Sequence, residues 1–227
     1  VRLCGATFLV FNGFQMVAAF SVYIIVFYLF NGSYELAGSW PAWFSSITAV
    51  VTAFLVIPTI SWISDKVGKR KAFIISTAIS IVGYLLKWWA FNPDNPWLIF
   101  MPIPFMAFGL GGLFTLMMSM TADVCDLDEL NNGMPRKEGT FGAIYWWMVK
   151  LGQALALVLG GLVLKLVGFD GNAAQQTAET LLNLRIADIV IPASTAFLAI
   201  LVMWKYNLTE ERAREIKAEL EARRGEL

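Results

Sequence analysis

Residues 40–91 read WPAWFSSITAVVTAFLVIPTISWISDKVGKRKAFIISTAISIVGYLLKWWAF, and this stretch decides the fold. Two apolar runs, at 40–63 and 72–91, flank a short charged loop at 64–71. Each run has the roughly 20 apolar residues that a helix needs to cross a bilayer core of about 30 Å. The stretch therefore predicts two membrane-spanning helices joined by a charged turn.

The rest of the chain repeats this pattern. Further apolar runs lie at 3–30, 97–121, 141–167 and 182–204, which makes six in total. Of the 227 residues, 58% are hydrophobic and 15% are charged, against about 45–50% and about 25% in soluble domains. We expect an all-α membrane protein with a bundle of six transmembrane helices over 1–206 and a tail at 207–227.

The loops alternate in charge, which predicts the orientation. Basic residues crowd the loops at 64–71 and 136–138 and the tail, whereas 31–39, 92–96 and 168–181 contain no Lys or Arg. By the positive-inside rule, the basic loops and both ends of the chain are cytoplasmic. We expect a multi-pass protein of the cytoplasmic (inner) membrane, in contact with the lipid bilayer.

Several classes of chemistry lack their usual residues. There is no histidine, and the two cysteines, Cys4 and Cys125, are far apart and are expected to be free thiols. The formal net charge is zero, so we expect no nucleic-acid partner. The chain starts at Val1 with an apolar run almost at once, and we expect this to be a truncated start.

Lys150 is the residue that fits a membrane least well. It follows position 141, where its run starts, by nine residues, so a helix places its Cα roughly 13 Å deep, near the midplane. A lysine there costs about 2.5–3.5 kcal/mol and needs a cavity or a carboxylate. Trp146, Trp147 and Gln153 share its helical face. We expect this face to bind a ligand with many hydroxyls and apolar ring faces; a structural ion pair is the other interpretation.

Other polar residues inside the spans have plainer interpretations. We expect Lys87, Lys165 and Arg185 to extend toward water at the outer helix ends, and Asp188 to pair with Arg185 at i,i+3. Asn12 could contact either ligand or another helix. The fourth run contains Pro102, Pro104, Gly109, Gly111 and Gly112, which predicts a bend or a close helix crossing.

A cluster of charges follows the fourth run. Asp123, Asp126 and Glu129 share one helical face at i, i+3 and i+6, and Arg136 and Glu138 follow in the next loop. Taken alone, these residues could form a latch that gates a pathway or a Mg²⁺ site. In the tail, Thr209 is placed to cap a short helix whose apolar stripe of Ala213, Ile216 and Leu220 we expect to lie on the membrane surface.

Two motifs resemble known transporters. The loop Ser64-Asp65-Lys66-Val67-Gly68-Lys69-Arg70-Lys71 is similar to the loop motif of the major facilitator superfamily. The series Asp123, Asp126, Glu129, Arg136, Glu138 and Lys150 resembles the glycoside–pentoside–hexuronide:cation symporters, the melibiose permease-like family. The resemblance covers essentially the whole chain, as the C-terminal six-helix bundle of a major facilitator fold.

The resemblance implies a sugar pocket between two six-helix halves. Lys150 would lie on its wall, and Phe114 takes the place of an aromatic residue that faces the sugar in this family. Trp146 stands where the melibiose carrier has a threonine, which leaves the substrate open. The family's cation-binding aspartates lie in the N-terminal half, so this half would need that partner to couple transport to Na⁺ or H⁺, with no resident cofactor or metal.

The leading hypothesis is therefore sugar:cation symport by half of a transporter. Its charged residues at the cytoplasmic mouth, expected to act as a gate, are Asp65, Arg70, Asp123, Asp126, Glu129, Arg136 and Glu138. The alternatives are a major facilitator transporter of another solute, a Mg²⁺-dependent prenyl-transfer enzyme that uses Asp123 and Asp126, and a six-helix scaffold or channel that forms homo-oligomers.

Overall fold

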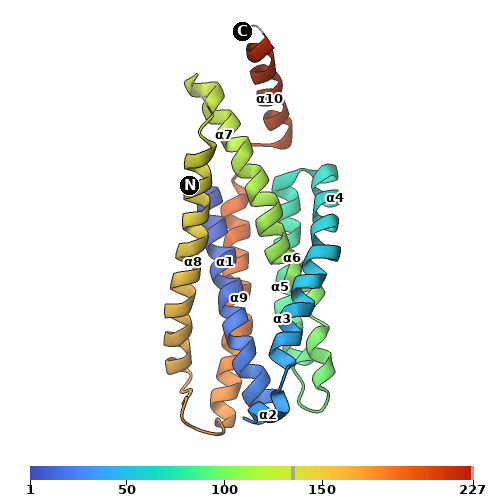
Figure 1. The fold of residues 1–227 in the computed structure, drawn as a ribbon, viewed down its shortest axis with the longest axis vertical. Coiled ribbons are helices and arrows are strands. Elements are labelled where there is room, and N and C mark those ends of the chain that lie inside the picture. The colour runs from blue at the N-terminus through green and yellow to red at the C-terminus, as the bar shows by residue number, and fades with distance from the viewer. Residues whose placement is uncertain (134–135, 226–227) are drawn as a thin grey trace.

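The computed structural model describes residues 1–133 and 136–225, and within them the chain is almost entirely helical (Figure 1). Six helical segments are long and apolar enough to cross a membrane, as the sequence predicts. The elements in chain order are α1 (Arg2–Tyr23), η1 (Ile24–Leu29), α2 (Tyr34–Ala37), α3 (Trp40–Val51), η2 (Thr52–Val56), α4 (Ile57–Val67), α5 (Lys69–Ala90), η3 (Pro96–Phe100), α6 (Ile103–Gly112), η4 (Leu113–Met117), α7 (Met118–Asn132), α8 (Glu138–Leu166), α9 (Ala178–Trp204) and α10 (Glu210–Gly225).

The two ends of the bundle differ in charge. The short helix α2 and the loops without Lys or Arg lie at the lower end in Figure 1, and α7 and α10 extend beyond the spans at the other end. We call the second end the basic end, because it carries the loops at 64–71 and 136–138 and the tail. The loops thus divide between the two ends as the sequence predicts, and the cytoplasmic location of the basic end stays a prediction.

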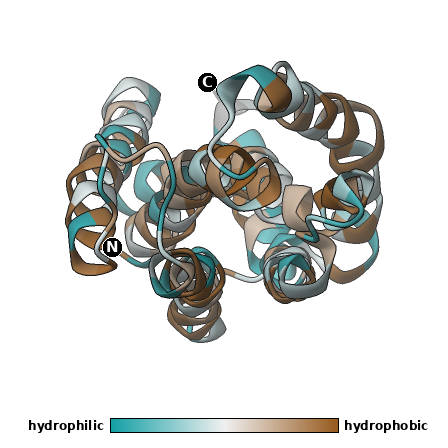
Figure 2. Cartoon of the chain, turned by 90° about the horizontal axis from the view of Figure 1, so that it is seen from below, coloured by the Kyte–Doolittle hydropathy of each residue, from teal (hydrophilic) through white to brown (hydrophobic). Residues whose placement is uncertain are grey.

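Helix α1 is the most buried of the six spans, and it packs along both α9 and α8. Helix α9 also packs against α5, and α5 in turn packs against α6. Apolar residues cover most of the spanning helices when the bundle is seen end-on (Figure 2). The span that contains α3 and α4 is the least buried, and α8 is the next least. These two spans therefore present large apolar surfaces that the chain itself does not cover.

Glycines let α6 approach its neighbours closely, which confirms the predicted helix crossing. A Cβ on Gly109 would lie 2.9 Å from Oγ of Ser80 in α5, and one on Gly111 would lie 2.6 Å from Cγ1 of Val56 in η2. Gly83 of α5 faces the backbone of α6 in the same way. Small residues make such crossings possible in lipid, where helices associate by close packing.

The tail helix packs against the protein. Thr209 caps α10, as predicted, by accepting a hydrogen bond from the Arg212 N–H at 3.3 Å. The stripe of Ala213, Ile216 and Leu220 is buried, and α10 contacts α7. The expectation that this stripe lies on the membrane surface is therefore wrong, because α7 extends beyond the spans and α10 packs against it. Residues 226–227 of the tail lie outside the described residues.

We expect Gly83→Ala to destabilise the bundle. The added Cβ would lie 2.5 Å from the backbone nitrogen and 2.9 Å from Cγ of Met106, and overpacking of this kind typically costs about 1–3 kcal/mol. Thermal unfolding in detergent measures the effect. Gly161→Ala in α8 is the matched control, because a Cβ there meets nothing within 4 Å. Equal stability of the two variants would contradict the close crossing.

Candidate functional site

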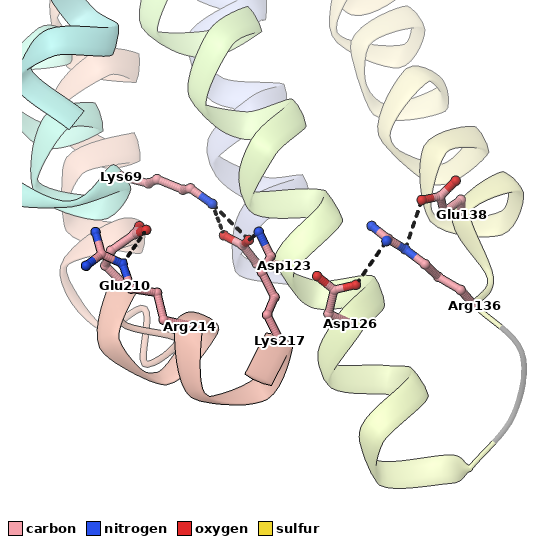
Figure 3. A network of polar contacts seen from close by, with 8 residues as sticks. All are labelled: Lys69, Asp123, Asp126, Arg136, Glu138, Glu210, Arg214 and Lys217. Atoms are coloured by element: carbon pink, nitrogen blue, oxygen red, sulfur yellow. Dashed lines mark hydrogen bonds and ion pairs between the residues drawn. The ribbon is translucent and has the colours of Figure 1, made fainter. Parts of the chain in front are cut away.

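Asp123 is the centre of one charge cluster at the basic end (Figure 3). Its carboxylate accepts hydrogen bonds from Nζ of Lys69 at 2.8 and 2.6 Å, and Nζ of Lys217 in α10 lies 3.8 Å away. Burial raises the pKa of Tyr206, and the nearby Asp123 carboxylate raises it further. Three elements, α5, α7 and α10, thus meet at a single buried carboxylate.

Asp126, one turn further along α7, belongs to a second cluster. Arg136 lies 3.2 Å from Oδ1 of Asp126 and 2.8 Å from Oε1 of Glu138, so it bridges α7 and the start of α8 (Figure 3). The sequence predicts this group, and the structure brings its members together. A further pair, Lys137 and Asp128 at 3.2 Å, lies in the same connection and was not predicted.

Three further members of the predicted gate are Arg70, Asp65 and Glu129. Arg70 donates a hydrogen bond to the carbonyl of Trp204, the last residue of α9. Asp65 is exposed near the end of α4, and Glu129 lies partly buried on α7, one turn beyond Asp126. The cation from the 64–71 loop that pairs with α7 is therefore Lys69 and not Arg70, the member of the loop that was predicted to belong to the gate. The place of Lys69 in the loop motif was visible in the sequence, but its partner was not.

The second candidate site is the open face, which we define as Trp146, Trp147, Lys150 and Gln153 of α8 with Phe114 of η4. The four α8 residues are all exposed, Trp146 by 47% and Trp147 by 61%. The Phe114 and Trp146 rings lie 6.3 Å apart between centroids, so the structure brings together two predicted site residues from different spans. No ion pair involves Lys150 within residues 1–133 and 136–225.

Asn12 is the exception among the predicted substrate-binding residues. It is 5% exposed, and its side-chain amide donates a hydrogen bond to the Gly152 carbonyl of α8 at 3.1 Å. Of the two interpretations that the sequence allows, this geometry supports the contact between helices.

A buried ion pair corrects another expectation. Lys87 of α5 does not extend toward water but pairs with Asp188 of α9, and each is only 1% exposed. Arg185 is not the partner of Asp188: it donates to the Tyr28 hydroxyl at 2.8 Å and to the Trp88 carbonyl at 2.7 Å. Proximity on one helix suggested the wrong pairing, because the contact between α5 and α9 is not visible in the local sequence.

The six spans and the separation of charged loops between the two ends of the bundle define a polytopic membrane protein. Residues 6–210 match the sequence model of the family described as MFS/sugar transport protein. The chain therefore belongs to this family of the major facilitator superfamily, which confirms the predicted resemblance and excludes the enzyme alternative. Consistent with this, Asp123 and Asp126 are each paired with a different cation.

Named relatives are similar over much of the chain. A glucuronide carrier protein homolog of Escherichia coli is 27% identical over 167 residues, 74% of this chain and 36% of the relative. A candidate sulfoquinovose importer of Escherichia coli is 28% identical over 98% of this chain and 46% of the relative. A candidate 2,3-dihydroxypropane-1-sulfonate exporter of Salmonella typhimurium has the same identity and the same shares of both chains. The chain thus spans less than half the length of these relatives.

We expect Lys69→Met to destabilise the basic end, because it removes the main partner of the buried Asp123 carboxylate. Hydrogen bonds to charged groups contribute about 1.5–3 kcal/mol, and Lys217 is too distant to replace Lys69 fully. Thermal unfolding is the measurement. Lys71→Met, two residues along the same helix at an exposed position, should change stability by less than about 0.5 kcal/mol. Equal losses would show that Asp123 does not depend on Lys69.

Proposed function

We propose that this chain is the C-terminal half of a twelve-helix secondary active transporter that couples uptake of an acidic sugar to a cation. The exposure of Lys150 near the membrane midplane carries the proposal, because a lysine there needs a partner and the described part of the chain supplies none. A sugar pocket between this half and an N-terminal half would supply water, substrate and opposing charge.

The relatives suggest the chemical class of the substrate. A glucuronide carries a carboxylate, and sulfoquinovose carries a sulfonate. The open face offers a cation for such an acid group and the rings of Trp146, Trp147 and Phe114 for the apolar faces of a pyranose. A small acidic solute is a second candidate, because one relative bears the name of a candidate exporter of a three-carbon sulfonate.

The coupling cation, Na⁺ or H⁺, would bind mainly in the N-terminal half. The protein would lie in the cytoplasmic membrane with the basic end inside, in accordance with the positive-inside rule. The clusters around Asp123 and Asp126 would then lie at the cytoplasmic mouth. The cations of these pairs are partly exposed, Lys69 by 17% and Arg136 by 31%, so water can hydrate them when they exchange partners as the two halves rock.

We expect Lys150→Gln in the complete transporter to weaken uptake of a glucuronide about 10- to 100-fold, because a charge-assisted bond contributes about 1.5–3 kcal/mol. Uptake of the matching neutral glucoside should fall less. Lys165→Gln, an exposed lysine near the other end of α8, is the control and should transport normally. An equal effect of Lys150→Gln on both sugars would contradict recognition of the acid group.

We expect Asp126→Asn to slow transport while sugar binding stays within about twofold. A shift of one or two kcal/mol in a gate changes the ratio of its two states by about 5- to 30-fold. Uptake rates and equilibrium binding in the same membranes separate the two effects. Asp128→Asn, which removes the more exposed pair with Lys137, is the control. A loss of binding would place Asp126 in the substrate site.

We expect residues 1–227 alone to accumulate no sugar in liposomes under a Na⁺ or H⁺ gradient. Lys150 would face lipid or another copy, and half of the pocket would be missing. Co-expression with the N-terminal half should restore uptake. Gradient-driven accumulation by residues 1–227 alone would favour a complete six-helix transporter.

A further inference from the structure

The Lys87–Asp188 pair lies inside the bundle and apart from both candidate sites. Both side chains are 1% exposed in this chain alone, so neither faces the open side that Lys150 occupies. The pair joins α5 to α9, two spans far apart in sequence. It thus needs an explanation other than substrate binding or the gate at the basic end.

The residues around the pair pack against it but leave part of its hydrogen-bonding capacity unused. Nζ of Lys87 lies 5.0 Å from the centroid of the Phe91 ring, and the buried Tyr84 lies one turn before Lys87. Oδ1 of Asp188 has no hydrogen-bond partner among the described residues. Arg185 is occupied by Tyr28 and Trp88.

Stability alone does not account for such a pair. Two charges lose their hydration when they are buried, and well-packed apolar residues of similar volume often hold two elements together equally well. The best-attested use of a buried polar group in a helix bundle is to fix the register of one helix against another.

Besides this pair, the polar contacts of Arg185 with Tyr28 and Trp88 join α9 to its neighbours, and they involve one flexible side chain near the end of the helix. The apolar residues that α9 buries are Leu184, Ile189, Pro192, Ala196, Ala199 and Met203, so most positions would still bury an apolar side chain after a shift by one turn. Lipid tails are as apolar as these residues, so burial hardly favours one register over another. A shift of one turn, about 5.4 Å, would instead leave Lys87 and Asp188 unpaired in the membrane.

We propose that the Lys87–Asp188 pair sets the axial register of α9 in the bundle. The register has consequences at the opposite end, because α9 ends at Trp204, whose carbonyl accepts from Arg70, and leads into α10, which brings Lys217 to Asp123. The pair therefore positions part of the basic-end network. A role of this positioning in gating rests on the proposed function. The register of α9 itself does not, because it can be measured without any transport assay.

Cysteine pairs between α1 and α9 report the register. An ideal Cβ at Gly13 lies 3.4 Å from Cβ of Thr195, close to the separation of about 3.5–4.5 Å that a disulfide needs. The full-length protein, with Cys4 and Cys125 replaced by alanine, would carry Gly13→Cys with Thr195→Cys. Gly13→Cys with Ile191→Cys or with Ala199→Cys reports a shift of one turn in either direction.

With the native pair present, we expect only the 13–195 disulfide to form. In the Lys87→Met/Asp188→Leu background, a shifted disulfide should form in at least a tenth of the chains. Lys165→Met is the control background and should keep the single register. Scoring by gel shift of alkylated protein in whole membranes requires only insertion, which the loss of two charges favours.

A single 13–195 disulfide in the Lys87→Met/Asp188→Leu background would overturn the proposal, whatever its transport activity. The conservative variant Asp188→Glu, which retains the charge, provides the second measurement. It should form only the 13–195 disulfide, and a shifted disulfide there would equally overturn the assignment. Loss of transport with an unchanged register would count against the proposal as well, since it would give the pair a role in the cycle instead.

Discussion

A charged side chain in the hydrocarbon core of a bilayer must find an opposite charge, water or a ligand, and this constraint organises the whole bundle. The chain answers it in two ways. Lys87 finds Asp188 inside the bundle, where both are covered by the chain's own helices. Lys150 is left exposed on α8, beside exposed indoles and an amide. The Lys87–Asp188 pair is thus neutralised within the chain, whereas Lys150 depends on water, a ligand or another protein surface.

The same constraint separates the fixed parts of the protein from those able to move. In pairs at the basic end, such as Arg136 with Asp126, the cation is partly exposed, so water can hydrate it when the pair opens. The Lys87–Asp188 pair has no such substitute. Close glycine contacts between α5 and α6 add to the rigidity around it. The end opposite the basic end is thus held by contacts that water cannot replace, and the basic end by contacts whose cations water can reach.

The sequence predicted those features that depend on length and local spacing. The six spans follow from apolar runs of sufficient length, and the Asp126–Arg136–Glu138 group follows from residues close together in the chain. Features that depend on which helices touch were out of reach. The partner of Asp188 is 101 residues away (188 − 87), whereas Arg185 is one turn away and was the wrong choice. The burial of the tail on α7 and the contact of Phe114 with Trp146 have the same origin: helix packing decides them.

The distance between Lys87 and Asp188 along the chain also matters during biosynthesis. Ribosomes add about 5–20 residues per second, so roughly 5–20 s pass between the synthesis of Lys87 and that of its partner. During this interval α5 is a nascent helix that carries an unneutralised cation. It must wait beside the insertion machinery, or with this side chain stretched into the headgroups, until α9 arrives. Pairing with α9 is therefore what neutralises α5, and a chain cut short before α9 would expose an unpaired cation that membrane quality control can recognise.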